Sequence, residues 1–87
     1  MILINAKDAS NAYLNNKFNE EEKYFIFKEI ESILEEINSK CKDINYITRF
    51  YGNQEDIIIS FIAFRLQRFF GYNIRYGVHK EIIISWA

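Results

Sequence analysis

Apolar residues recur at helical spacing in the first half of the chain, in two stretches separated by a polar break. The first predicted helix covers about residues 6–15, and Asn5, followed three residues later by an acidic residue, has the spacing of an N-terminal cap. Asn19 and Glu22 repeat that spacing after the break. We therefore expect a second helix from Asn19 to about Ser39.

The second predicted helix is amphipathic. One side is apolar and consists of Ile26, Phe27, Ile30, Ile33, Leu34 and Ile37. The other side carries the carboxylates Glu29, Glu31, Glu35 and Glu36. This spacing is typical of a helix whose apolar stripe lies on another layer of the protein.

A strand and a third helix follow. From Ile44 to Tyr51, β-branched and aromatic residues alternate, which predicts a strand ended by Gly52. Asn53 is a favourable N-cap residue, and we expect it to begin a helix that runs to about Phe70. Gly71 then stands where a left-handed residue closes a helix.

The last stretch predicts a β-hairpin, because alternating apolar residues over 72–76 and 82–86 flank the short connection 77–80. The order α-α-β-α-β-β predicts an α+β fold, a small two-layer sandwich with helices packed on a three-stranded sheet that ends in this hairpin. No proline, linker or repeat interrupts the chain, so residues 1–87 are predicted to form a single domain.

Aromatic residues make up 17% of the chain, with eight Phe and six Tyr. A small core does not easily bury so many rings, so we expect some of them in a subunit interface or a ligand site. Alternation also places Ile83 on the face opposite Ile82 and Ile84, which suggests that both faces of the last strand are covered. These features favour a homo-oligomer.

Composition also indicates the expected cellular location and disfavours some classes of partner. Cys41 is the only cysteine, so no internal disulfide forms and the interior of a cell is the expected location. No apolar run approaches the length that spans a membrane. The formal net charge of −1 disfavours a nucleic acid as the partner.

The chain lacks the residue patterns of the common enzyme sites. His79 is its only histidine, so a Ser/His/Asp triad or a histidine-based metal site would need groups that are absent from the sequence. The three glycines are scattered and form no phosphate-binding loop. The clustered glutamates are explained by a solvated helix face. We therefore expect no enzymatic activity, no metal and no cofactor.

The arginines form the one cluster of residues that suggests a binding site. Residues 1–43 contain nine acidic residues and six lysines, a balance of −3, whereas residues 44–87 contain three acidic and five basic residues, a balance of +2. Guanidinium groups interleaved with tyrosine rings suit the recognition of phosphates and bases. The candidate ligand-binding residues are Arg49, Tyr51, Arg65, Arg68, Arg75 and Tyr76. In the alternative interpretation, these arginines pair with the acidic face of the second helix, in the same subunit or in a neighbour.

Three short motifs resemble a widespread set of short phage proteins of unknown function. The motifs are Ile4-Asn5-Ala6-Lys7-Asp8-Ala9, Leu66 to Gly71-Tyr72-Asn73-Ile74, and Ile83-Ile84-Ser85-Trp86. Those phage proteins open with an Ala-Lys-Glu-Ala helix, carry a Leu-Gly-Tyr-x-Val turn and close with Ile-Ser-Trp. The departures are Asp8 for Glu, Phe70 for Leu, Ile74 for Val and the additional Ala87. The resemblance implies a phage or prophage origin and the same α+β layout, and it brings no catalytic residues.

Two functions are consistent with these features. The first is a non-enzymatic phage accessory protein that acts against host defence in the host cytoplasm. It would bind a host defence protein or sequester a small anionic signalling nucleotide. The second is a minor virion or assembly subunit whose exposed rings make contacts between subunits. A DNA-binding regulator is disfavoured, because no basic recognition helix is evident.

Overall fold

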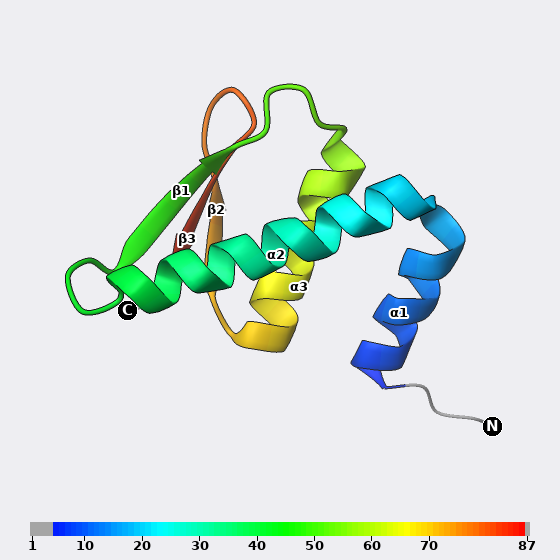
Figure 1. Ribbon diagram of the computed structural model, residues 1–87, viewed down its shortest axis with the longest axis horizontal. Helices are drawn as coiled ribbons and strands as arrows, with labels where there is room; N and C mark the ends of the chain where they lie inside the picture. Colours follow the sequence, from blue (N-terminus) through cyan, green and yellow to red (C-terminus); the bar gives the residue numbers. More distant parts are fainter. Residues whose placement is uncertain (1–4, 87) are drawn as a thin grey trace.

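The computed structural model describes residues 5–86, in which helices and strands follow the predicted order α-α-β-α-β-β. The helices are α1 (Ala6–Lys17), α2 (Glu20–Lys40) and α3 (Asp56–Phe70). The strands are β1 (Tyr46–Phe50), β2 (Asn73–Tyr76) and β3 (Glu81–Ser85). Figure 1 shows α2 as the longest element, with α1 packed near its first turns and the sheet near its last. The predicted α+β class is confirmed.

Side-chain caps define the beginnings of the first two helices. The Asn5 side chain accepts a hydrogen bond from the backbone N–H of Asp8, with an oxygen-to-nitrogen distance of 2.8 Å. Asn19 and Glu22 form a complete capping box, because each side chain accepts a bond from the other's backbone N–H, at 2.8 and 2.9 Å. Both caps are those that the sequence predicts, and they satisfy N–H groups that the helix itself leaves free.

The third helix begins later than predicted. Its N-cap is Glu55, whose side chain makes no capping bond, so the assignment of Asn53 as the cap was wrong. The reason lies in the preceding turn, where the backbone N–H of Gln54 donates to the carbonyl of Tyr51 at 3.0 Å. Asn53 lies inside this turn, and the chain enters the helix only after leaving it.

The three strands form an antiparallel sheet in the order β1-β3-β2. One face of the sheet carries the aligned row Ile47, Ile84 and Ile74 and lies against α2 and α3. The core is centred on this contact, and its fully buried side chains are Ile26 and Ile33 of α2, Ile62 and Leu66 of α3, and Ile82 and Ile84 of β3. The other sheet face remains open: Ile83 lies there between Thr48 and Arg75 and is half-buried.

Two tight turns build the C-terminal part. Gly71 ends α3 with φ of 75°, and the backbone N–H of Tyr72 returns to the carbonyl of Leu66 at 3.2 Å, as the glycine stop predicts. In the hairpin connection, His79 and Lys80 adopt φ of 56° and 59°. Two consecutive left-handed residues match the right-handed twist of the flanking strands. This match explains why His79 and Lys80 have a backbone conformation that residues other than glycine rarely adopt.

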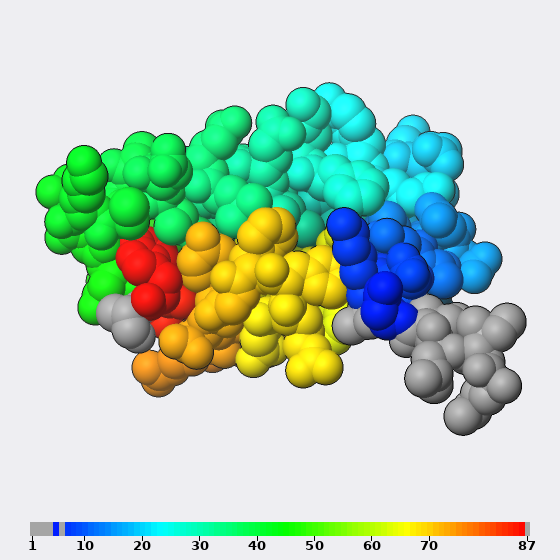
Figure 2. Space-filling view, turned by 90° about the horizontal axis from the view of Figure 1, so that it is seen from below, coloured from blue at the N-terminus to red at the C-terminus, as the bar shows by residue number. Residues whose placement is uncertain are grey.

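The described part of the chain is elongated, with extents of 46 × 29 × 20 Å. In Figure 2, α1 (blue) lies at one end of the molecule, α3 (yellow) in the middle, and the C-terminal hairpin (orange and red) towards the other end. Within residues 5–86, no helix is both long and apolar enough to cross a membrane.

Candidate functional site

The six residues proposed from the sequence as a ligand site lie on or beside three elements, β1, α3 and β2. Arg49 and Tyr51 lie at the end of β1, near α2. Arg65 lies on α3 and reaches α1. The other three, Arg68 at the end of α3 and Arg75 and Tyr76 on β2, are exposed. The structure therefore brings Arg49 and Tyr51 together, and it directs Arg49 towards α2 and Arg65 towards α1.

Arg49 points to the helical side of the sheet and is paired with α2. Its Nη1 donates to Glu29 Oε1 at 2.6 Å, and its Nε and Nη2 donate to Glu36 Oε1 at 3.2 and 2.8 Å. Nη2 also donates to the Ser32 hydroxyl at 3.2 Å. For this arginine, the pairing with acidic helix residues is the observed arrangement, so its charge is already balanced within the protein.

The Tyr51 side chain is buried, and its hydroxyl makes no hydrogen bond to the described residues. Burial, and secondarily the nearby Glu29 carboxylate, raises the pKa of this phenol well above its ordinary value. Glu29 is close enough to act on the phenol electrostatically, although no hydrogen bond of acceptable geometry joins the two groups. A hydroxyl in this state remains protonated and neutral in ordinary buffers.

Arg65 connects α3 to α1. Its Nη1 donates to the Ser10 hydroxyl and to Asn11 Oδ1, both at 3.1 Å. The guanidinium carbon also lies 4.7 Å from the ring centre of Phe69 and within 6 Å of those of Phe27 and Phe61. Burial lowers the pKa of this guanidinium, which nevertheless stays charged because an arginine is not deprotonated in proteins.

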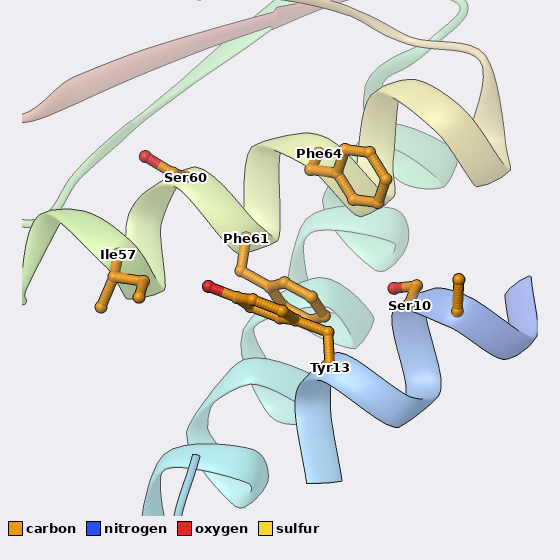
Figure 3. A pocket seen from close by; sticks show the side chains of 7 residues that line it. Ser10, Tyr13, Ile57, Ser60, Phe61 and Phe64 are labelled. Carbon is orange, nitrogen blue, oxygen red and sulfur yellow. The ribbon is translucent and has the colours of Figure 1, made fainter. Parts of the chain in front are cut away.

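Next to this connection, α1 and α3 form the walls of an apolar groove with a volume of about 410 Å³ (Figure 3). Its lining residues are Ala9, Ser10 and Tyr13 of α1 and Ile57, Ser60, Phe61 and Phe64 of α3. None of these lining residues is charged. Their polar side-chain groups are the hydroxyls of Ser10, Ser60 and Tyr13. The volume lies within the range of about 300–1,000 Å³ that is typical of ligand sites.

Aromatic rings give the groove its shape. Tyr13 and Phe61 stack with ring centres 5.6 Å apart and ring planes inclined by 19°, and Figure 3 shows the pair between the two helices. Phe61 is buried and forms the floor, whereas Tyr13 and Phe64 remain 45% and 40% exposed. Phe18 packs against both stacked rings, so the floor is continuous with the core. The groove therefore offers a rigid apolar floor with exposed rings at its rim.

A second, more polar hollow of about 310 Å³ lies at the end of β1. It is lined by Phe25, Glu29, Arg49, Phe50, Tyr51, Gly52, Asn53 and Gln54. Its one cation is held by Glu29 and Glu36, so this hollow presents no free positive charge to an anionic ligand. The described residues also contain no cluster of three or more histidine, cysteine, aspartate or glutamate side chains that could hold a metal ion.

Comparisons with known proteins identify no relative of this chain. No family model matches it, and neither the curated proteins nor the solved structures include a match.

The groove between α1 and α3 is not among the features predicted from the sequence. One signal was present: Phe64 lies outside the apolar stripe formed by Ile58, Phe61, Ile62, Leu66 and Phe69 on the same helix. A large ring off the core stripe indicates a second contact surface. The docking position of α1 depends on tertiary contacts that the helical pattern does not reveal, and so the groove's second wall was not predictable.

Proposed function

We propose that this protein is a non-enzymatic binding protein that holds an amphipathic helix of a partner protein in the groove between α1 and α3. The observation that carries the proposal is the apolar, ring-lined groove itself, which lies between two helices and stays open to solvent. A third helix packed between two others is a common way to cover such a surface.

The lining chemistry favours an apolar protein segment over a small anion. The groove walls carry no charged side chain, so they offer nothing to balance a phosphate or carboxylate. The exposed rings of Tyr13 and Phe64 are the kind of rigid aromatic surface that contributes strongly to protein interfaces. A partner that inserts one or two large apolar side chains into the groove would bury the exposed parts of Tyr13 and Phe64.

The resemblance to short phage proteins supplies a biological setting for this proposal. In that setting the partner is a host protein, and occupation of one of its amphipathic helices would block its action in defence. The alternative of nucleotide sequestration draws less support from the geometry, because Arg49 is neutralised by α2 and Arg65 is used between α3 and α1.

A displayed library of amphipathic helical peptides, selected on the purified full-length protein, tests the proposal. We expect the selected peptides to share apolar residues at positions i, i+3 or i+4, and i+7. Their affinity, measured by fluorescence anisotropy, should fall by about tenfold or more for Ala9→Glu, which places a charge in the groove.

The matched control is Tyr24→Ala, which removes an aromatic ring that is 67% exposed on α2 and outside the groove. This variant should bind the selected peptides as the wild type does. Peptides without apolar periodicity, or peptides that bind Ala9→Glu as tightly as the wild type, would show that the groove is not the site. Circular dichroism of both variants verifies that their fold is retained.

A further inference from the structure

The strand β1 lies at an edge of the sheet, where its only neighbour among the described residues is β3. The backbone N–H of Tyr51 donates to the carbonyl of Lys80 at 3.0 Å, and that of Trp86 donates to the carbonyl of Asn45 at 3.2 Å. In an antiparallel pair, residues on one strand turn their N–H and C=O groups alternately towards and away from the neighbour. It follows that Tyr46, Thr48 and Phe50 direct their backbone N–H and C=O groups away from β3.

These outward groups are self-complementary. We propose that two copies of this protein associate by antiparallel pairing of their β1 strands about a two-fold axis at Thr48, which joins the two sheets into one. In this register Thr48 pairs with Thr48 of the second copy, and Tyr46 pairs with Phe50 of the second copy. All three residues then exchange backbone hydrogen bonds with their counterparts, which satisfies every outward N–H and C=O of the strand.

The side chains on the open sheet face support the same register. Tyr46 and Phe50 are 52% and 66% exposed, and the pairing places each of them directly opposite a ring of the other copy. Aromatic and threonine cross-strand pairs stabilise antiparallel strands. A monomeric protein commonly protects the edge strands of its sheet with charged side chains. The open face of β1 carries none, because its one charged residue, Arg49, is turned to the helical side and paired with α2.

The other edge of the sheet is less suited to a second copy. The backbone N–H of Gly77 donates to the carbonyl of Glu81 at 2.9 Å, so Ile74 and Tyr76 are the residues of β2 whose backbone groups point outward. A two-fold pairing of β2 between these residues is centred on Arg75, which is exposed on the open face. Two guanidinium groups would then stand directly opposite each other, and their repulsion disfavours this arrangement. In Figure 1, β1 is the outermost strand of the sheet, with β3 and β2 together on one side of it.

Amide hydrogen exchange, measured by NMR at two protein concentrations, tests the pairing on the unmodified protein. At the higher concentration the amides of Tyr46, Thr48 and Phe50 should exchange at least about tenfold more slowly than in the dilute sample. The amides of Ile74 and Tyr76, on the other edge, serve as internal controls and should not change. Protection of the β2 amides in place of those of β1, or no concentration dependence in either strand, would overturn the proposal.

Charge variants give a second test by sedimentation equilibrium. Thr48→Lys and Thr48→Asp should each be monomeric, since each places like charges opposite one another at the two-fold axis, and an equimolar mixture should recover the dimer. Tyr76→Lys, on the other edge, should dimerise as the wild type does. A wild type that stays monomeric, or a Thr48→Lys variant that dimerises equally well, contradicts the proposal. The groove between α1 and α3 is formed by other residues, so this outcome leaves the proposed function untouched.

Discussion

Arg49 on β1 and Glu29 on α2 form an ion pair with 2.6 Å between Nη1 and Oε1, and both side chains are more than three-quarters buried. Glu36 completes the arrangement from the next turns of α2, at 2.8 Å from Nη2. This cluster attaches the longest helix to an edge strand of the sheet, next to the apolar core. It shows how an arginine that suggests a ligand site in the sequence instead contributes to the fold.

Replacing Arg49 by Ala should destabilise the protein. The change leaves the partly buried Glu29 without its partner and Glu36 with Lys40 alone, and we expect a loss of about 1–3 kcal/mol in the free energy of unfolding. Urea denaturation followed by circular dichroism measures this loss. The exposed Arg75 provides the control, because Arg75→Ala should change stability by about 0.5 kcal/mol or less. Equal effects of the two substitutions would mean that the cluster contributes no net stability.

The same cluster predicts a dependence of stability on acid pH. The hydrogen bond from Lys40, and after it the contacts with Arg49, hold the pKa of Glu36 below its ordinary value of 4.5 in the folded state, although burial opposes them. The unfolded chain therefore binds a proton at Glu36 before the folded protein does. The resulting stabilisation is present above the ordinary pKa and is lost as the pH falls below about 4.5 towards the folded value.

Urea midpoints measured from neutral pH down to acid pH check this expectation. Wild-type stability should decline more steeply below the ordinary pKa than that of Glu36→Gln, which has no proton to bind at this position. Glu35→Gln, at the exposed neighbouring position, serves as the control and should follow the wild-type curve. Parallel curves for the wild type and Glu36→Gln would contradict the assigned role of Glu36.

Tyr51→Phe removes a buried hydroxyl that has no hydrogen-bond partner among the described residues. Because an unsatisfied buried polar group is costly, the variant should be as stable as the wild type or more stable by up to about 1 kcal/mol. The raised pKa of Tyr51 also predicts that stability falls as the pH rises above the ordinary phenol value of 10.0, and this part of the decline should be absent from Tyr51→Phe. Thermal melts at neutral and alkaline pH measure both effects. A loss of more than about 1 kcal/mol at neutral pH would show that the hydroxyl is bonded after all.

Local patterns were sufficient to predict much of the fold. The capping box of Asn19 and Glu22, the left-handed Gly71 and the hairpin over its short connection all depend on neighbouring residues, and the structure confirms each of them. The start of α3 was misplaced because Asn53 is as suitable for a turn as for a cap, and the turn that begins at Tyr51 uses it.

The candidate site was harder to predict because it depends on how elements pack. The alternative interpretation, that the arginines pair with the acidic face of the second helix, is confirmed for Arg49, but the sequence did not indicate which arginine and which carboxylates would meet. Helical periodicity likewise predicted the first helix without revealing that Tyr13 stacks on Phe61. Both contacts join residues far apart in the sequence.

Arg65→Ala should loosen the attachment of α1 and open one side of the groove. The substitution removes the bonds to Ser10 and Asn11, both 3.1 Å long, and the contacts of the guanidinium with the surrounding rings. We expect a loss of about 1–3 kcal/mol in the free energy of unfolding, together with faster amide exchange in α1 than in α2. Arg65→Lys keeps the charge but not the paired donor geometry, so its effect should be intermediate.

The control for this prediction is Arg68→Ala, one turn further along α3 at an exposed position. It removes the same side chain, and the exchange rates in α1 should stay at their wild-type values. Since Ser10 lines the groove, Arg65→Ala should also weaken the binding of groove-selected peptides, whereas Arg68→Ala should not. If α1 amides exchange equally fast in both variants, Arg65 does not hold α1 in place, and the stacked rings of Tyr13 and Phe61 must be sufficient to do so.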